Sequence, residues 1–411
     1  MSIRWITPHL GTGPYSAKTD EKNLTVIDVR DLVDKPGNPA LPIAAKIEQG
    51  VTALKNGQRV VVCCDYGISR SNAIAAGIMA SYSNDSLEHS LRLVLKATGE
   101  TEVKLGPLMA VRNALGFQPR KNPDHKSVIL VIGGSGFLGQ AFQKKVSKQI
   151  KILAPSRKEL DLSEGSTRLA LLVEEHNVDW VIHLANPRVY TSNKAMGQTL
   201  AMLRNAIDVC VTLNIPLLYP SSWEIYSGYA GTLRVDEATP AMPRGPYGET
   251  KYLAETLIEH HVRTSGLRCA LLRSSPVYGQ GSDRPKFIYN FLEKAAQNLS
   301  ISTHRYSNSD PMLDLLHVDD LVSAIIASIQ NSHVGVLNIG TGVLTSTKNI
   351  AQMLVAMQNS HSPVEQISID SETACIAMNW NQARRKIGWA PKISLEVGLK
   401  KVFSHILERN E

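Results

Sequence analysis

The chain has 411 residues, 43% of them hydrophobic and 20% charged, which is the composition of a globular protein with two or three domains, or one large domain and an appendage. No run approaches the roughly 18 consecutive apolar residues of a membrane-spanning helix, and the N-terminus lacks a signal-peptide pattern, so no membrane association is expected. The net charge is +7, but the basic residues are scattered; this disfavours nucleic acid as a partner and suits a small anionic substrate.

Apolar runs and polar breaks predict two domains. A strand-like run at residues 58–64 is followed by helix-like segments at 71–82, 86–97 and 103–115, and a second strand-like run comes at 127–133. The stretch 118–126 between these blocks holds two prolines and no large apolar residue, as a linker does. We therefore predict a first domain at 1–118, a linker at 119–126 and a second domain at 127–411.

Cys64 and Arg70 enclose a short loop between the first strand and an apolar helix. A loop of this length directs backbone N–H groups inward at a helix N-terminus, where they stabilise a thiolate and a phosphate dianion. Arg70 would hold two phosphoryl oxygens, and Ser71 would assist departure of the thiolate. The alternative is a core strand that ends in two buried cysteines. The predicted phosphate-binding residues are Asp65, Tyr66, Gly67, Ile68, Ser69, Arg70 and Ser71.

This strand, loop and helix resemble the dual-specificity branch of the cysteine phosphatases, over about residues 3–117. The resemblance implies that Cys64 is the nucleophile and Arg70 the phosphate clamp. A general acid is expected about thirty residues before the cysteine; we choose Asp34, with Asp31 as the alternative. Cys63 stands where the family usually has histidine, which implies reduced activity or unusual specificity. Cys63 is also a candidate to trap an oxidised Cys64, although adjacent cysteines form a strained disulfide.

After the linker, strands and helices alternate. The candidate strands are residues 128–133, 150–155, 180–185, 216–221 and 268–273, separated by helical stretches. Alternation of this kind predicts a parallel sheet covered on both faces. The predicted fold class is α/β: a cysteine-phosphatase-like domain, then a Rossmann doubly wound sheet with a small C-terminal substrate subdomain.

Gly133, Gly136 and Gly139 follow the first strand of this block and open a helix. Their spacing permits a tight turn, close approach of backbone N–H groups to a pyrophosphate, and close packing of helix on strand. The spacing by itself leaves a glycine-rich turn without a ligand as the alternative.

Tyr247 and Lys251 are four residues apart and so share one face of a helix. A nearby cation lowers the pKa of a phenol from about 10, which makes the phenol usable as an acid or base near neutral pH. Upstream, Ser221 and Ser222 end a predicted strand, where one hydroxyl would hydrogen-bond a substrate oxygen.

Nearly all of residues 127–410 resembles the extended short-chain dehydrogenase/reductases that act on nucleotide-linked sugars. The matching segments are the glycine turn and residues 183–186, 221–226, 247–251, 272–279, 317–320, 338–342 and 387–391. The resemblance implies Tyr247 as general acid/base, Lys251 as ribose ligand, Ser222 as catalytic hydroxyl, and a homodimer formed through helices near 202–213 and 247–263. The implied cofactor-binding residues are Gly133, Ser135, Gly136, Phe137, Leu138, Leu184, Ala185, Tyr247 and Lys251.

The residues after the second strand favour NADP over NAD. NAD-binding units usually place a carboxylate there to hold the ribose 2′-hydroxyl, whereas this chain has Ser156, Arg157 and Lys158. Arg157 would clamp a 2′-phosphate; the alternative is that both cations face solvent. Asp161 and Leu162 resemble the family's adenine-contacting pair, and Asp161 is equally suited to cap a helix.

Trp223 stands where the family's 4,6-dehydratases have an aspartic acid, so dehydration is disfavoured. The leading hypothesis is a bifunctional enzyme: an NADPH-dependent reductase of a nucleotide-linked keto-sugar, in surface-polysaccharide or deoxysugar biosynthesis, fused to a phosphatase. The second hypothesis is that the dehydrogenase-like domain is an epimerase. A rival hypothesis is an NADP-sensing regulator. Substrate residues are expected in the segments 190–198, 286–306 and 359–377, where Lys286 and Arg305 are candidates for binding a diphosphate or for solvated surface. The five cysteines show no metal-ligand spacing, so we expect no metal and a reducing cytoplasmic location.

Overall fold

The computed structural model describes residues 2–17, 23–116, 127–146, 150–187, 191–282 and 286–410. Contacts between residues divide the chain into two compact units. The first contains Met1–His125 together with Leu160–Val178 and Asp208–Ile215, and the second contains the rest. The predicted linker and the boundary at residue 118 lie outside the described residues and stay predictions.

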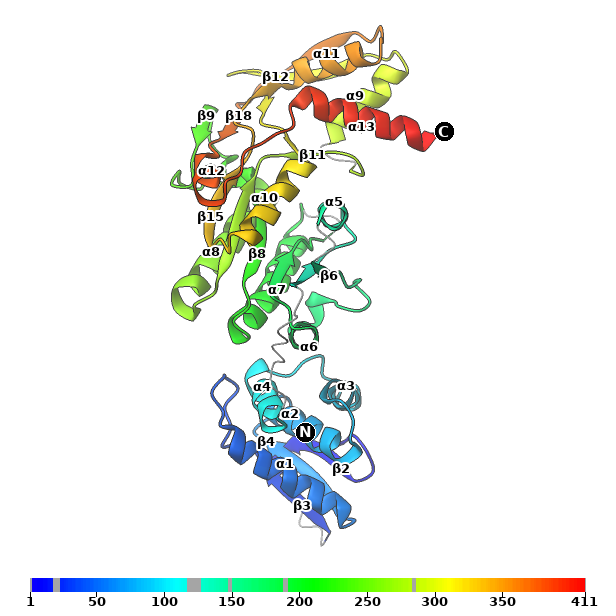
Figure 1. Cartoon of the computed structure of the whole chain (residues 1–411), viewed down its shortest axis with the longest axis vertical. Coiled ribbons are helices and arrows are strands. Elements are labelled where there is room, and N and C mark those ends of the chain that lie inside the picture. The colour runs from blue at the N-terminus through cyan, green and yellow to red at the C-terminus, as the bar shows by residue number, and fades with distance from the viewer. Residues whose placement is uncertain are drawn as a thin grey trace. The chain divides into compact units, whose positions relative to one another are not determined.

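The first unit is built on a four-stranded sheet in the order β1-β2-β4-β3, in which β2, β4 and β3 are parallel and β1 is an antiparallel edge. Helix α1 packs on α2 and α4, and α2 also packs on α3 (Figure 1). The predicted strand and helices are confirmed. The elements are β1 (Arg4–Trp5), β2 (Leu10–Pro14), η1 (Tyr15–Ala17), β3 (Leu24–Asp28), α1 (Ala40–Lys55), β4 (Arg59–Cys64), α2 (Arg70–Ser83), α3 (Leu87–Thr98) and α4 (Leu105–Ala114).

Strand β4 is buried on both faces, as its unbroken apolar sequence requires. Val60, Val62 and Cys64 belong to the core that the helices complete. Successive side chains of a strand point to opposite faces, so Val61 and Cys63 face the other way. Cys63 is therefore directed away from Cys64 and is not placed to trap it when oxidised. None of the five cysteines, all within the described residues, forms a disulfide.

The second unit contains a six-stranded, fully parallel sheet in the order β15-β10-β8-β7-β5-β6. All five predicted strands are present, and a sixth, unpredicted strand closes one edge. The first strand, β5, lies between β6 and β7, so the order reverses there; ligands of such sheets bind beyond the carboxyl ends of the strands at this point. The strands are β5 (Val128–Ile132), β6 (Lys151–Leu153), β7 (Trp180–His183), β8 (Leu217–Ser222), β10 (Cys269–Ser274) and β15 (Gly335–Ile339).

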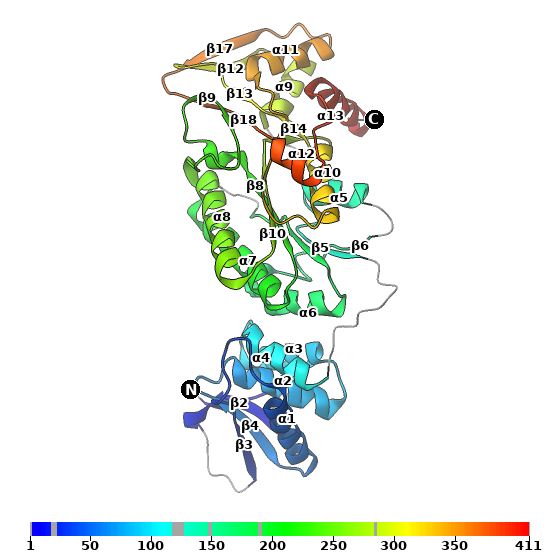
Figure 2. The same cartoon turned by 60° about the vertical axis from the view of Figure 1, so that its left-hand side comes forward.

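Helices cover both faces of this sheet, as the alternation predicts. Helices α5, α10 and α12 bury apolar side chains against one face, and α8 packs on β8 and β10 from the other (Figure 2). Outside the C-terminal subdomain, the helices after residue 127 are α5 (Phe137–Lys145), η2 (Leu162–Glu164), α6 (Thr167–Glu175), α7 (Asn193–Thr212), η3 (Trp223–Tyr226), α8 (Gly245–Ser265), α10 (Val318–Gln330) and α12 (Asn381–Ile387). Of these, η2 and α6 lie in the segment that groups with the first unit.

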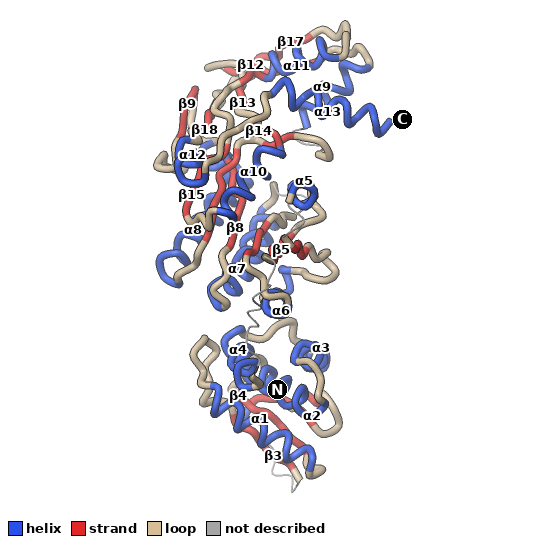
Figure 3. The backbone as a smooth tube through the Cα atoms, in the orientation of Figure 1, coloured by secondary structure: helices blue, strands red, loops and turns tan. Residues whose placement is uncertain are grey.

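A small C-terminal subdomain has its own core, formed by α9, α11, α13 and the parallel pair β12–β17 (Figure 3). Three further two-stranded pairs, β9–β18, β11–β14 and β13–β16, complete the unit. The elements are β9 (Gly231–Val235), β11 (Val277–Tyr278), α9 (Lys286–Ala296), β12 (Ile301–Tyr306), β13 (Met312–Leu313), β14 (Leu316–His317), β16 (Thr345–Ser346), α11 (Thr347–Met357), β17 (Val364–Ile369), β18 (Ala374–Met378) and α13 (Leu395–Asn410). Across the described ranges, no helix combines the length and apolarity needed to cross a membrane.

Candidate functional site

In the first unit, β4 ends at Cys64 and α2 begins at Arg70, so the residues between them form a turn at a helix N-terminus. Gly67 has φ +71°, and any side chain there would collide with the backbone of Gly13. The left-handed backbone and the tight approach both require glycine at this position.

Donors converge on the Cys64 sulfur. The Gly67 N–H donates to Sγ at 3.1 Å, and the Ser71 hydroxyl lies 3.4 Å away. Burial raises the pKa of the Cys64 thiol, but hydrogen bonds from the Ser71 hydroxyl and from the N–H groups of Ser71, Ile68 and Tyr66 lower it more, and the net shift is downward. The loop thus favours a thiolate, the nucleophilic form of cysteine.

Arg70 is fixed beside this loop. Its Nη1 donates to the Leu32 carbonyl oxygen at 2.9 Å and its Nη2 donates to Asp65. Asp34 lies 3.8 Å from Nε of Arg70, whereas Asp31 pairs with Lys46 at 3.1 Å. The structure therefore brings Cys64, Arg70 and Asp34 together, and it places the carboxylate of Asp31 on a different partner.

The loop is also held from outside. Ser69 Oγ accepts the Lys104 N–H at 3.0 Å. Tyr66, by contrast, extends toward solvent and is 69% exposed. Arg4 donates to the Gly67 carbonyl oxygen and, at 2.7 Å, to that of Thr98. Sequence reasoning did not identify Arg4, because an isolated arginine near a terminus carries no motif.

In the second unit, the glycine turn has the geometry of a pyrophosphate cradle. Gly133 has φ +84°, and a Cβ there would lie 2.7 Å from the Ala185 nitrogen. A Cβ on Gly139 would lie 2.6 Å from the Gly134 Cα, so helix α5 packs closely on the turn. Both positions therefore require glycine, and the tight turn that they allow leads directly into the N-terminus of α5, which suits the diphosphate of a dinucleotide.

Beyond the turn lies a cavity of ≈ 530 Å³. It brings together Phe137, Leu138, Leu184 and Ala185 from the predicted cofactor set with the predicted catalytic pair Tyr247 and Lys251. Its lining among the described residues also includes His183, Asn186, Tyr219, Pro220, Ser221, Ser274, Val277, Gly281, Ser282 and Leu321.

Ser222 is not on that wall. Its hydroxyl oxygen accepts the Glu224 N–H at 3.2 Å and caps η3, while the wall carries Ser221, its neighbour on β8. The catalytic role of Ser222 therefore stays a prediction. The sequence alone allows either hydroxyl at the strand end, and the resemblance to the family favours Ser222.

Lys251 is buried, and its ammonium is oriented by two acceptors. Nζ donates to the Pro220 carbonyl oxygen at 3.0 Å and to Tyr219 Oη at 3.2 Å, and it lies 5.8 Å from the ring centroid of Tyr247. Burial lowers the pKa of Lys251 to about 8, with Glu255 opposing this change. The side chain therefore carries its charge at neutral pH and loses it in the mildly alkaline range.

His183 is a second buried titratable group on the cavity wall. Burial, and to a lesser extent the charge of Lys251, lower its pKa to about 3. Neither ring nitrogen has a hydrogen-bond partner among the described residues. Its ring centroid is 5.9 Å from that of Tyr219. His183 begins the segment 183–186 that resembles the family, and the sequence indicates no role for it.

The end of β6 lies beside the glycine turn, since a Cβ on Gly134 would be 2.6 Å from Ala154 Cβ. The exposed turn that follows carries Ser156 and Arg157. The Ser156 N–H donates to Glu159 at 2.7 Å, and this bond holds the pKa of the Glu159 carboxyl below its usual range.

Other predicted residues are less clearly placed. Asp161 accepts the Ser163 N–H at 2.9 Å and caps η2, and Leu162 is buried. Both lie in a segment that groups with the first unit, so their contact with adenine stays a prediction.

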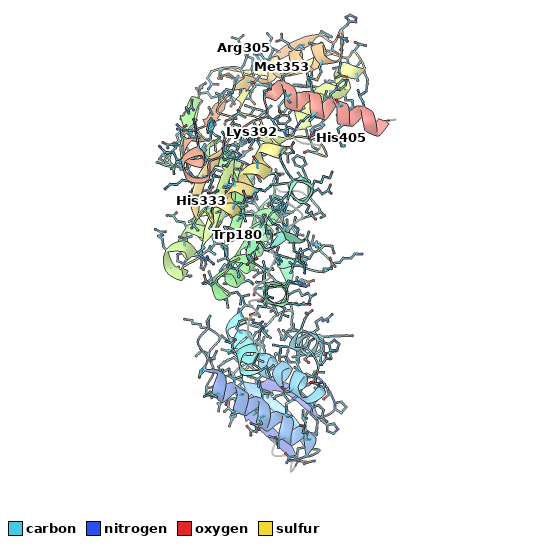
Figure 4. The ribbon with its side chains drawn as sticks, in the orientation of Figure 1. Trp180, Arg305, His333, Met353, Lys392 and His405 are labelled. Atoms are coloured by element: carbon cyan, nitrogen blue, oxygen red, sulfur yellow. The ribbon has the colours of Figure 1, made fainter. Side chains whose placement is uncertain are left out.

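Lys286 and Arg305 are exposed, and Arg305 lies on β12 of the subdomain (Figure 4). Tyr190 lies outside the described residues. Within the described ranges, no group of three metal-ligating side chains comes together.

Comparison with known proteins agrees with this geometry. The model of the NAD dependent epimerase/dehydratase family matches residues 129–340. The chain is 24% identical over 314 residues to dTDP-4-dehydro-6-deoxyglucose reductase of Escherichia coli, an alignment that spans 68% of this chain and 98% of that protein.

Two solved structures illustrate the likeness in fold. UDP-glucose 4-epimerase of Thermus thermophilus in complex with NAD has a TM-score of 0.60 at 19% identity, covering 68% of this chain and 99% of that one. RMD from Pseudomonas aeruginosa in complex with NADPH has a TM-score of 0.61 at 22% identity, covering 69% and 99%. Because the family model spans more than half of the sequence, and the cradle and the Tyr247–Lys251 pair lie within it, the chain belongs to the NAD dependent epimerase/dehydratase family.

Proposed function

We propose that the second unit reduces the keto group of a nucleotide-linked sugar with NADPH. The observation that carries this proposal is the placement of Tyr247 and Lys251 on the wall of a cavity that Phe137 and Leu138, the first residues of α5 after the glycine turn, also line. A bound nicotinamide dinucleotide supplies the hydride.

The protein's own groups account for the proton. As a carbonyl carbon is reduced, charge develops on its oxygen, and the Tyr247 hydroxyl donates a proton to that oxygen. Lys251, whose ammonium lies on the same helix face, stabilises the resulting phenolate. Ser222 beside the wall, whose hydroxyl oxygen accepts the Glu224 N–H and so keeps its own proton, donates a hydrogen bond that orients the carbonyl; the proton of Ser221 on the wall is taken by Glu255.

Reduction and epimerisation differ in cofactor stoichiometry. With dTDP-4-dehydro-6-deoxyglucose, the substrate implied by the name of the Escherichia coli relative, we expect one NADPH oxidised for each sugar reduced. The measurement is the loss of NADPH absorbance set against product by mass spectrometry, and boiled protein is the control. Isomerisation of a sugar nucleotide without net oxidation would instead establish the epimerase.

Arg157 is the residue on which the preference for NADP rests, because it follows the β6 end that lies beside the cradle. Arg157→Ala is expected to raise the Kd for NADPH about tenfold, because it removes one charge-assisted hydrogen bond and such a bond contributes about 1.4 kcal/mol. The Kd for NADH is expected to stay unchanged. Fluorescence titration measures both. Lys158→Ala, one residue further along the same exposed turn, is the matched control. Equal weakening of both cofactors would contradict the assignment.

A second activity is proposed for the first unit: hydrolysis of a phosphate monoester through Cys64. The observation that favours it is the convergence of backbone N–H groups on the Cys64 sulfur beside the fixed guanidinium of Arg70. Arg70 Nη2 now binds the carboxylate of Asp65, and a phosphoryl group would take that place. Asp34 is the proposed general acid, because its carboxylate lies 3.8 Å from Arg70 Nε, whereas that of Asp31 pairs with Lys46. Phosphate release from an aryl phosphate, dependent on Cys64, tests this activity.

Together the two activities would make a bifunctional enzyme of sugar metabolism. We propose this in preference to a cofactor-sensing regulator, because a sensor would not need Tyr247 and Lys251 on the cavity wall. We also propose a cytoplasmic homodimer. Apolar side chains exposed on α8, namely Tyr252, Leu253 and Val262, supply a surface for it. Sedimentation of the purified chain measures the mass of the assembly.

A further inference from the structure

Three side chains follow one another at four-residue intervals along the buried face of α8: Tyr247, Lys251 and Glu255. The first two line the cavity, whereas Glu255 lies one turn further and is 7% exposed. A carboxylate at this depth has lost most of its hydration, so its partners decide what it does.

Glu255 binds the ends of two parallel strands. Its Oε1 accepts the hydroxyl of Ser221, the last but one residue of β8 and part of the cavity wall. Its Oε2 accepts Nε and Nη2 of Arg273, on the neighbouring strand β10, at 3.0 and 2.8 Å. This two-point pairing fixes the plane of the carboxylate as well as its position.

Arg273 is fixed in turn by the polypeptide around the site. Its Nη1 donates to Tyr226 Oη at 2.7 Å and to the Glu237 carbonyl oxygen at 3.2 Å. Tyr226 ends η3, the short helix that Ser222 caps. One ion pair thus ties α8, β8, β10 and η3 together directly behind the wall that bears the reacting groups.

Stability alone does not explain such a pair. Buried ion pairs are on average no more stabilising than apolar side chains of similar volume, because both charges lose hydration. What a charged, doubly hydrogen-bonded pair adds is orientation. We propose that Glu255, held by Arg273, is a positioning residue of the active site. It accepts the proton of the Ser221 hydroxyl, so that Ser221 presents its oxygen to the cavity as an acceptor, and from one helix turn away it maintains the ammonium of Lys251.

The charges around Lys251 are consistent with this role. The groups that face it are Tyr219 on β8, His183 on β7, and Tyr247 and Glu255 on α8. His183 is neutral at the pH of catalysis. Glu255 is the group whose charge raises the pKa of Lys251 against burial.

The inference rests on the family's Tyr–Lys pair and not on whether the reaction is reduction or epimerisation, so its first test needs no substrate. The ionisation of Lys251 is measured by competitive labelling of the full chain with acetic anhydride across pH, read by mass spectrometry of the Lys251 peptide. Glu255→Gln is expected to lower the midpoint by about 1 pH unit, since a nearby carboxylate favours the charged amine by that order. Glu259→Gln, on the exposed side of the same helix, is the matched control and is expected to leave it unchanged.

Kinetics supply the second readout. In whichever reaction the enzyme performs, Glu255→Gln is expected to lower kcat about tenfold with little change in KM, and to move the alkaline limb of the pH profile downward with the Lys251 midpoint. Glu255→Asp keeps the charge and is expected to restore the midpoint while kcat stays reduced, because its shorter chain does not reach both Ser221 and Arg273.

Should Glu255→Gln not fold, Glu255→Asp and Ser221→Ala carry the test: Ser221→Ala is expected to lower kcat and leave the Lys251 midpoint in place. A folded Glu255→Gln variant with an unshifted midpoint and wild-type kcat overturns the proposal. Absence of any turnover by the wild-type protein would instead contradict the proposed reaction, and the labelling result would stand by itself.

Discussion

Replacing Tyr247 by phenylalanine is expected to lower kcat of the proposed reduction about 10²- to 10⁴-fold, the range that a positioned general acid contributes. The substitution removes one oxygen from a side chain on the cavity wall and keeps the ring, so packing and the α8 backbone are retained. The Kd for NADPH is expected to stay within about threefold of the wild-type value, because the cradle at the N-terminus of α5 is untouched. Initial rates of NADPH oxidation and fluorescence titration measure the two quantities.

The same helix offers a control for this experiment. Tyr252 is 42% exposed on the outer side of α8, and Tyr252→Phe is expected to retain wild-type kcat. Lys251→Met is expected to impair both kcat and cofactor affinity, since Lys251 is assigned to proton transfer and to the ribose. A Tyr247→Phe variant that keeps more than a tenth of wild-type kcat would show that another group donates the proton.

The burial of Lys251 also predicts how the reaction rate depends on pH. The pKa of about 8 places its loss of charge in the mildly alkaline range. Below that pH the ammonium is present and supports Tyr247, so the rate is expected to fall as pH rises through about 8.

The sequence predicts those parts of the fold that depend on local pattern. The apolar runs before the two turns are β4 and β5, and each of the other predicted strands lies where its hydrophobic run indicates. The sequence does not indicate the edge strand β15, because residues 335–339 form only a short apolar run, which overlaps the family segment 338–342. A tertiary contact, its pairing with β10, makes it a strand.

The candidate site likewise combines relations that the local sequence indicates with relations that only the folded chain creates. Spacing alone indicates that Tyr247 and Lys251 share a helix face, because that relation is local. The partners of Lys251 are not local: Tyr219 and Pro220 come from β8, about thirty residues earlier, and meet it only through sheet topology. The choice between Ser221 and Ser222 depends on strand pleating and a cap, which residue types do not reveal. Asp34 and Asp31 are likewise equivalent in sequence and differ only in their ion pairs.

Replacing Cys64 by serine is expected to abolish phosphatase activity, by about 10³-fold or more, because removing a covalent nucleophile costs at least this much in comparable enzymes. The substrate is para-nitrophenyl phosphate and the readout is release of nitrophenol. Cys63→Ser is the matched control: Cys63 points to the opposite face of β4, so its substitution is expected to leave kcat within a few-fold of wild type. Equal loss in both variants would indicate a folding defect and not a lost nucleophile.

The pH dependence of this hydrolysis separates the enzyme from a mere phosphate-binding loop. Burial raises the pKa of Cys64, and the hydrogen bonds from Ser71, Ile68 and Tyr66 lower it more, so the thiolate forms below the ordinary pH of a cysteine and the acid limb of kcat/KM lies correspondingly low. Ser71→Ala removes the hydroxyl that makes the largest lowering contribution, and the acid limb is expected to move to higher pH. Asp34→Asn is expected to lower kcat about 10²-fold because it removes the proposed general acid beside Arg70, whereas Asp31→Asn is expected to leave kcat unchanged. A wild-type protein that binds phosphate but releases no nitrophenol at any pH would contradict the proposed hydrolysis and would indicate that the first unit only binds phosphate.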